Sequence, residues 1–295
     1  MIRIEIGRRH YLLYLLLPHR LKVSLLSEGS RAKLDRINEG FNERIYSGAG
    51  ATGYDQIHRY AEADQHEYPA RALVDDGWGP GGFGRAIELG AGSGYFTVRI
   101  ARRAHTVLAV EPVADLRDVL VARCRAEGVH NVELVDVTAQ ELSAVVPAGT
   151  VDTAICVQSL HHFHRRDEVF RALGRAVRPG GRLYLLEPHH NLRRAGRLLR
   201  KYLTSYRRRE FWTDERNWAT HDFMTRGELR RLCRIGGFGD VRLSGYWIPF
   251  TRRLLPDPRR RVALERRLGR LPVLRHWAAV LGVEATRTAE PPGHG

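Results

Sequence analysis

One acid and three glycines at alternating positions form the most distinctive chemical group in the chain. They are Glu88, Gly90, Gly92 and Gly94 in the run IELGAGSG, which joins an apolar segment to a helix-like one. Glycines tolerate positive φ and let a ligand approach the backbone, and the N–H groups at a helix start can bind polar ligands. The dinucleotide fingerprint has the different spacing G-x-G-x-x-G, which seats a pyrophosphate. Because a carboxylate repels a pyrophosphate and pairs with an ammonium group, this loop favours an amino-acid ligand.

Two more acids end the next two apolar segments. Glu111 follows TVLAV, where a carboxylate can accept hydrogen bonds from both hydroxyls of a ribose. Asp136 lies in VELVDV, where a carboxylate can accept a hydrogen bond from an adenine amino group. Three acids at successive strand ends, beside one glycine loop, predict a site for an adenosine that carries a charged amino acid.

Histidines follow the fourth apolar segment in the run LHHFH, residues 160–164. No carboxylates adjoin them, so no metal site is predicted. One interpretation is that one histidine packs on the ligand while the others are solvated. The other is that His161 or His162 is a general base, which a weakly acidic nucleophile such as a hydroxyl would need.

Short apolar runs alternate with helical stretches from Arg85 onward, which predicts βαβ units and an α/β fold with a doubly wound, mostly parallel sheet. The expected strands are 86–89, 106–110, 131–137, 152–157 and 182–187, and the helices between them are 95–103, 114–128 and 167–177. Further on, helices are expected over 192–209 and 225–239, and strands over 240–248 and 277–287.

This stretch resembles a class I S-adenosylmethionine-dependent methyltransferase. The resemblance covers about residues 85–190 and rests on IELGAGSG, Glu111 in VEP, Asp136 in LVDV, DTAICVQSLHHF and RPGGRLYLLEP. It implies a methyltransferase enzyme that uses S-adenosylmethionine. It also implies a Rossmann-like sheet of seven strands whose last strand is antiparallel. No subfamily is identified.

The resemblance also implies roles for the matching residues. The glycine loop would line the methionine part of the cofactor, Glu111 would hold the ribose, and Asp136 would lie beside the adenine. The expected cofactor residues are Glu88, Gly90, Ala91, Gly92, Gly94, Glu111, Pro112, Asp136, Val137 and Gln158. His161 and His162 are the catalytic candidates. Glu187, His189 and His190 are further candidates to line the substrate pocket.

Five parts of the chain are expected around this core. Residues 1–82 form an N-terminal helical lid, in which Tyr46, Tyr54 and Tyr60 cover the cofactor crevice. The cofactor-binding core is 83–190, and a basic helical insert over the substrate is 191–224. The end of the core sheet is 225–287, with a second basic insert at 251–270, and 288–295 is a disordered tail.

Positive charge gathers in the C-terminal part of the chain. Residues 181–295 carry 25 Lys+Arg and 11 Asp+Glu, whereas the whole chain has a net charge of +15. Such a segment favours an acidic substrate, an anionic surface or nucleic acid. Three widely spaced cysteines exclude a disulfide scaffold and favour a reducing, cytoplasmic setting. The apolar run Tyr11–Leu17 is too short for a membrane span.

Three functions follow as hypotheses. The first is methyl transfer to a small molecule, an anionic specialised metabolite, with arginines of the basic inserts above the substrate. The second is methylation of RNA, against which stands the absence of an Asn/Asp-Pro-Pro-aromatic motif after the fourth strand. The third is non-methyl chemistry with the same cofactor, such as cyclisation, or a non-catalytic binding role. The sequence allows peripheral membrane contact and leaves the oligomeric state open, with a homodimer as one option.

Overall fold

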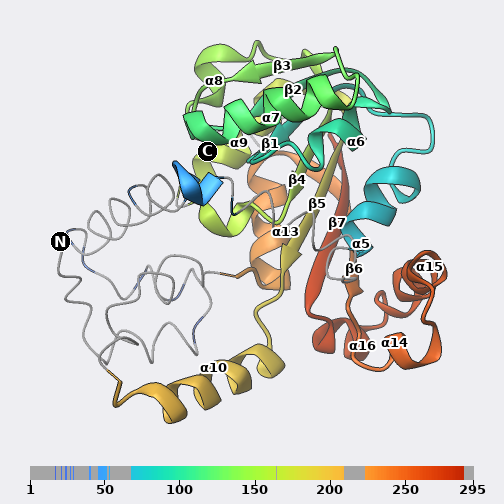
Figure 1. Ribbon diagram of the computed structural model, residues 1–295. Coiled ribbons are helices and arrows are strands. Elements are labelled where there is room, and N and C mark those ends of the chain that lie inside the picture. Colours follow the sequence, from blue (N-terminus) through green and yellow to red (C-terminus); the bar gives the residue numbers. More distant parts are fainter. Residues whose placement is uncertain are drawn as a thin grey trace.

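The computed structural model describes residues 46–51, 53, 68–163, 165–208 and 223–288, with six single positions before residue 46. These residues contain a seven-stranded sheet of strand order β3-β2-β1-β4-β5-β7-β6. Helices cover both faces of the sheet (Figure 1). The predicted α/β fold with a doubly wound, mostly parallel sheet is confirmed.

Five neighbouring strands of the sheet are parallel to one another. They are β1 (Gly84–Leu89), β2 (Ala104–Val110), β3 (Val132–Val135), β4 (Val151–Val157) and β5 (Val177–Pro188). The strand β7 (Val280–Arg287) lies between β5 and β6 (Phe238–Tyr246) and is antiparallel to both. The antiparallel last strand that the resemblance implies is therefore present.

Buried side chains form a core on each face of the sheet. Successive strand residues point to opposite faces, so Ile87 joins one core and Ala86 joins the other. The first core contains residues of α8 (Leu142–Val145), α9 (Arg166–Ala176) and α13 (Arg226–Ile235). The second contains residues of α5 (Tyr68–Ala72) and α6 (Thr97–Ala101), and α7 (Ala114–Ala126) adds Leu120 and Cys124 beside it. Because both faces are covered, the central strands β1 and β4 are mostly buried along their length.

The C-terminal part adds helices outside the sheet. The helix α10 (Leu192–Ser205) begins at Asn191, whose side chain accepts a hydrogen bond from the Arg194 N–H at 2.9 Å. The second basic insert contains α14 (Thr251–Leu254) and α15 (Pro258–Leu268), and α16 (Pro272–Trp277) follows. The last strand begins at Val280, three residues after the expected start at 277, because α16 extends to Trp277.

Two further findings concern the described residues as a whole. All three cysteines are free and buried. No helix among the described residues has the length and apolar content needed to cross a membrane.

Candidate functional site

The glycine loop after β1 adopts a conformation that favours glycine. Gly90, Gly92 and Gly94 have φ of 67°, 56° and 78°. A Cβ added to Gly90 would lie 2.6 Å from the Cβ of Ser159. At Gly94 an added Cβ would lie 2.7 Å from Leu120 Cγ. The loop therefore runs tightly between the end of β4 and the helix α7, and larger residues at these two positions would displace it.

The carboxylate of Glu111, which follows β2, holds this loop through a backbone hydrogen bond. Its Oε2 accepts the Gly92 N–H at 2.8 Å, and its Oε1 accepts the Val113 N–H at 3.0 Å. Burial raises the pKa of Glu111, although these two N–H groups act in the opposite direction. Each oxygen keeps a further acceptor site, because a carboxylate offers about four in all. Glu111 is thus fixed with acceptor capacity for two vicinal hydroxyls.

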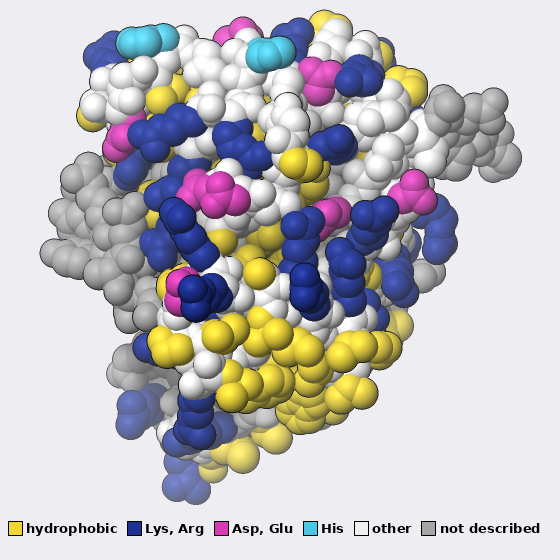
Figure 2. All heavy atoms as spheres, turned by 90° about the vertical axis from the view of Figure 1, so that its right-hand side faces the viewer, with side chains coloured by type: hydrophobic (Ala, Val, Ile, Leu, Met, Phe, Trp, Pro, Cys, Tyr) yellow, Lys and Arg dark blue, Asp and Glu magenta, His cyan; other side chains and the backbone are white. Residues whose placement is uncertain are grey.

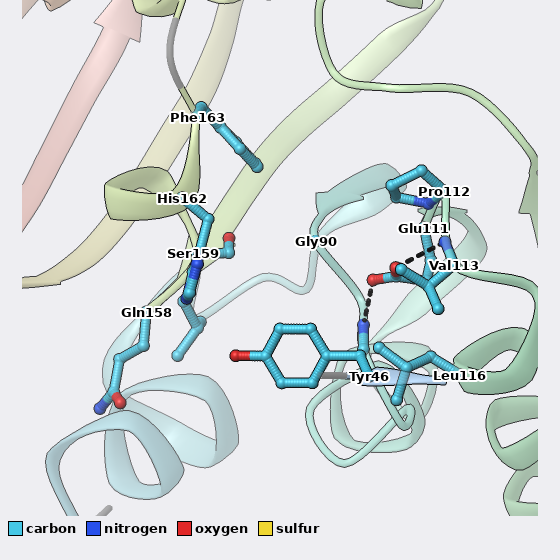
Figure 3. Close-up of a pocket in the computed structure, with 12 residues that line it drawn as sticks. Tyr46, Gly90, Glu111, Pro112, Val113, Leu116, Gln158, Ser159, His162 and Phe163 are labelled. Atoms are coloured by element: carbon cyan, nitrogen blue, oxygen red, sulfur yellow. Dashed lines mark hydrogen bonds between the residues drawn. The ribbon is translucent and has the colours of Figure 1, made fainter. Parts of the chain in front are cut away.

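A pocket of about 550 Å³, open to solvent, lies between Glu111 and the end of β4 (Figure 3). Its walls are mostly apolar, and its polar groups come from the glycine loop, Glu111 and the residues after β4. The lining residues are Tyr46, Gly90, Gly92, Glu111, Pro112, Val113, Leu116, Val157, Gln158, Ser159, His162 and Phe163.

The turn after β4 brings Gln158 and His162 into the pocket wall. Gln158 has φ of 52°, and its N–H donates to the Leu186 carbonyl at 2.8 Å. A left-handed conformation is uncommon for such a residue and recurs at functional sites. His162 belongs to a 3-10 turn, Leu160–His162. The ring of Tyr46 meets that of His162 edge-on, with centroids 6.1 Å apart. Burial raises the pKa of Tyr46 to about 12, so its hydroxyl stays neutral near pH 7.

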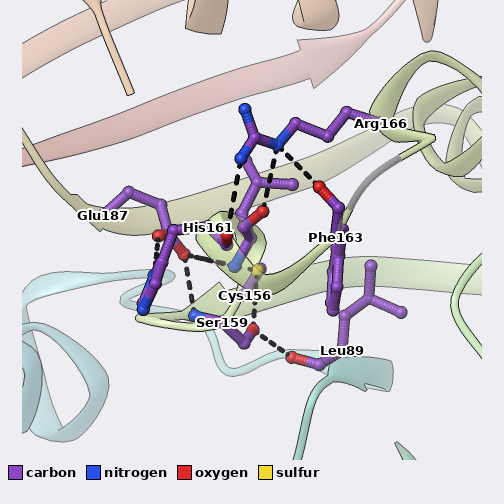
Figure 4. Close-up of polar contacts among 8 residues, drawn as sticks. Leu89, Cys156, Ser159, His161, Phe163, Arg166 and Glu187 are labelled. Carbon is purple, nitrogen blue, oxygen red and sulfur yellow. Dashed lines mark hydrogen bonds and ion pairs between the residues drawn. The ribbon is translucent and has the colours of Figure 1, made fainter. Parts of the chain in front are cut away.

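A fully buried carboxylate holds the other histidine of the pair. The Oε2 of Glu187 lies 3.0 Å from His161 Nδ1, and its Oε1 accepts the N–H groups of Ser159 and Leu160 at 2.9 and 2.8 Å (Figure 4). Glu187 is 0 % exposed, and the His161 side chain is 11 % exposed. Because Glu187 can only accept in this arrangement, Nδ1 of His161 carries the proton and Nε2 is left as a base.

A buried ion pair between Arg166 and Glu228 stabilises the turn that carries His161 and His162. The Nε of Arg166 donates to the carbonyls of Leu160 and Phe163 at 3.2 and 2.9 Å. Its Nη1 lies 3.0 Å from Glu228 Oε1, and both side chains are almost fully buried. Ser159 adds a hydrogen bond from its hydroxyl to the Leu89 carbonyl at 2.7 Å. The histidine turn is therefore tied to β1, β5 and α13.

Several expected cofactor residues lie outside the pocket wall. Glu88 is buried and accepts a hydrogen bond from the Thr97 hydroxyl at 2.6 Å, and burial raises its pKa to about 8. Asp136 is exposed and forms an ion pair with Arg117 at 2.5 Å. Val137 packs against the core, and Ala91 and Gly94 are buried in the loop. The contacts assigned to these five residues stay predictions.

The remaining expected positions divide in a similar way. Gly90, Gly92, Glu111, Pro112, Gln158 and His162 line the pocket. His161 lies behind His162, with ring centroids 4.2 Å apart. Sequence reasoning missed Ser159 and Phe163, whose positions follow from the turn geometry. Of the expected lid, Tyr46 reaches the pocket, whereas Tyr54 and Tyr60 fall outside the described residues.

The residues proposed to line a substrate pocket from β5 have other partners. Glu187 lies within the strand and contacts the histidine turn. His189 is buried and its Nδ1 lies 3.1 Å from the Ala278 carbonyl. Burial lowers the pKa of His189 to about 4, so it is neutral near pH 7. Its position is structural, because it joins the end of β5 to the segment before β7.

Comparison with known proteins gives three findings. Residues 87–185 match a family model described as a methyltransferase domain. The chain is 26 % identical over 164 residues to a ubiquinone biosynthesis O-methyltransferase of Cupriavidus pinatubonensis, which covers 55 % of this chain and 62 % of that one. It is 33 % identical over 125 residues to an uncharacterised methyltransferase of Mycobacterium tuberculosis, which covers 42 % and 47 % of the two chains. The chain thus spans less than two thirds of the length of these curated relatives.

Solved structures share the fold at low sequence identity. A possible histamine N-methyltransferase of Thermotoga maritima aligns with a TM-score of 0.55 at 16 % identity, over 83 % of this chain and 99 % of that one. A phosphoethanolamine N-methyltransferase of Haemonchus contortus, solved with S-adenosyl-L-methionine, aligns with a TM-score of 0.56 at 14 % identity, over 85 % and 60 %.

Proposed function

We propose that this chain, a member of the class I S-adenosylmethionine-dependent methyltransferase superfamily, methylates a hydroxyl group of a small molecule that also carries an anionic group. The observation that carries the proposal is the position of the His161–Glu187 pair. The pair lies behind His162. His162 itself lines the pocket, together with Glu111 and the glycine loop.

The pocket fits S-adenosylmethionine by the chemistry of its walls. Glu111 offers acceptor sites for ribose hydroxyls, and Gly90 leaves no room for a side chain beside Ser159. Leu116, Val113 and Phe163 provide apolar walls for a flat ring. The bound cofactor supplies an electrophilic methyl group on a positively charged sulfur. The chain's own task is then to position the acceptor and to remove its proton.

We assign that proton to His161, because it is the histidine that a buried carboxylate orients. Glu187 fixes its Nδ1–H, and this leaves Nε2 free to accept a proton from a hydroxyl. The same carboxylate stabilises the imidazolium that forms, so Glu187 acts as a positioning residue. His162 contributes to the pocket wall through its contact with Tyr46. The similarity to an O-methyltransferase supports an oxygen acceptor.

Two arginines at the start of α10 favour a substrate that carries an anionic group. Arg194 lies over the ring of Phe223 at 3.3 Å, and Phe223 in turn meets the His161 ring edge-on at 5.5 Å. The Nη1 of Arg193 is buried and has no hydrogen-bond partner among the described residues. Burial and the charge of Arg197 both lower the pKa of Arg193. An anion bound beside α10 would stabilise these cations.

The test is turnover with S-adenosylmethionine on a panel of hydroxybenzoates, catechols and their phosphate esters. We expect S-adenosylhomocysteine and an O-methylated product. With an active substrate, Glu187→Gln should lower kcat about 100-fold or more, because general-base catalysis contributes about 10² to 10⁴. The lower limb of the pH–rate profile should also move, because the imidazolium that forms loses the negative charge beside it. Glu133→Gln, on exposed β3, is the matched control.

Three outcomes would overturn the proposal. Methylthioadenosine as the product would indicate attack on the aminocarboxypropyl arm. Methylation of RNA without methylation of any panel member would indicate a nucleic-acid substrate. An unchanged pH profile in Glu187→Gln would exclude His161 as the base.

A further inference from the structure

The segment from Phe250 to Trp277 exposes an unusual number of large apolar side chains. Eleven large hydrophobic residues are exposed in the described part of the chain, and five of them lie in this segment. Leu254 and Val273 are 64 % and 69 % exposed. The five are Phe250, Leu254, Leu271, Val273 and Trp277, and we call them the α14–α16 apolar surface. Exposed apolar area that gathers on one face of a protein marks an interaction site.

The backbone beneath this surface is firmly anchored. Glu265 of α15 is fully buried and accepts hydrogen bonds from the Tyr68 hydroxyl at 2.6 Å and from the Ile248 N–H at 3.1 Å. Arg261 is also buried, and its Nε donates to the Leu255 carbonyl at 2.9 Å. A Cβ on Gly269 would lie 2.1 Å from the Gly245 carbonyl, so the end of α15 presses against β6. Little ordering is therefore needed when the apolar surface is buried by a partner.

The segment that carries the apolar surface is rich in arginine. Residues 250–277 contain nine arginines and two acids, and one of those acids is the buried Glu265. The other, Asp257, caps the start of α15. Arg252, Arg253, Arg267 and Arg270 are exposed, and none forms an ion pair with another described residue. Figure 2 shows a band of hydrophobic side chains across the lower part of this face, below a row of basic ones.

Only one kind of partner meets both features. A nucleic acid would contact the arginines but would leave the leucines and Val273 in water. A second copy of the chain would cover the apolar side chains but would bring two sets of arginines together. That partner is the surface of an anionic lipid bilayer. Its headgroups would pair with the arginines, and the boundary of its acyl chains would accept Phe250, Leu254 and Trp277.

We propose that the α14–α16 apolar surface and its arginines dock this protein onto an anionic phospholipid bilayer. Docking would be peripheral, with the apolar side chains at the level of the acyl boundary. The proposal stands apart from methyl transfer, because vesicle binding is measured without cofactor or substrate.

The test is co-sedimentation of the full chain with phosphatidylglycerol-rich vesicles and with phosphatidylcholine vesicles. We expect binding to the first kind alone, and weaker binding as salt concentration rises. Arg252→Gln with Arg253→Gln should lower the partition coefficient about thirtyfold, at about 1 kcal/mol per charge. Leu254→Ser with Val273→Ser should lower it about tenfold or more. Arg125→Gln, exposed on α7, and Val145→Ser, exposed on α8, are the matched controls.

A second measurement reports the orientation of the surface. Trp277 fluorescence should shift to shorter wavelength when vesicles are added, and Trp277→Phe should remove that shift. No vesicle binding by the wild type, or equal loss in the control variants, would overturn the proposal. Self-association that Leu254→Ser with Val273→Ser abolishes, without vesicle binding, would assign the surface to a second copy and would also overturn it.

Discussion

Replacement of Glu111 by glutamine tests the cofactor site with the smallest change in shape. The wild-type carboxylate accepts one backbone N–H at each oxygen, from Gly92 and Val113. Glu111 lines the pocket, and a carboxylate has acceptor sites beyond the two that these N–H groups occupy. Glutamine keeps one acceptor oxygen and replaces the other with an NH₂ group, which can only donate. The variant therefore cannot accept hydrogen bonds from two ribose hydroxyls and two backbone N–H groups together.

The expected loss follows from one charge-assisted hydrogen bond. Such a bond contributes about 1.5–3 kcal/mol, so the Kd for S-adenosylhomocysteine should rise about 10- to 150-fold. The stability of the unliganded protein should change less, because two effects oppose each other. One backbone N–H loses its acceptor, whereas the burial cost of a carboxylate with a raised pKa disappears.

Isothermal titration calorimetry with S-adenosylhomocysteine measures this loss, and thermal unfolding without ligand measures stability. Glu133→Gln, the same substitution at an exposed position on β3, should leave both unchanged. A Kd for Glu111→Gln within about threefold of the wild type would refute the reasoning, because that is less than one such hydrogen bond. Binding of NADH without binding of S-adenosylhomocysteine would refute the cofactor itself.

Three further predictions concern stability. Glu88 has a pKa of about 8 in the folded protein and an ordinary value of 4.5. The folded state thus holds the extra proton between these values, and unfolding free energy should fall as pH rises from 4.5 to 8, by up to about 1.4 kcal/mol per pH unit. Glu88→Gln should remove this slope in urea titrations, and an unchanged slope would contradict it. Gly90→Ala should cost at least about 1 kcal/mol at φ of 67°, with partial recovery by Ser159→Gly; full wild-type stability of the single variant in the same titrations would count against the tight loop. Arg166→Met should cost about 3–5 kcal/mol by leaving Glu228 buried without its partner. Arg166→Met with Glu228→Leu should recover most of that, and no recovery would place the cost elsewhere.

Local sequence signals predicted the first half of the site. The glycine loop and Glu111 each follow an apolar segment, and parallel strands bring such segments to one edge of a sheet. Their positions along the chain were therefore sufficient to predict that they lie at one site. The strand ends were harder to predict. β5 begins at Val177, five residues before the expected start, because Val177 pairs with Val151 of β4 and the residues 178–181 form an irregularity within that ladder.

The second half of the site depends on contacts between distant segments. Glu187 supports His161 because β4 and β5 are neighbours with Cys156 opposite Leu185, a register that no local pattern reveals. Asp136 ends its strand as expected, but its carboxylate pairs with Arg117 of α7. With 45 arginines in the chain, sequence alone cannot indicate which of them meets a given acid.

The place of β7 in the sheet has a consequence for the order in which the protein can fold during synthesis. β6 leaves the ribosome well before β7, yet β7 is its sole strand neighbour in the described sheet. Until residues 280–287 emerge, the edge of β5 that β7 will cover has no partner, and β6 cannot join the sheet. The nascent chain therefore exposes two unpaired strand edges for the time that α14, α15 and α16 are being made. Unpaired edges invite association with other chains, so this interval is where a chaperone would have the largest effect on yield.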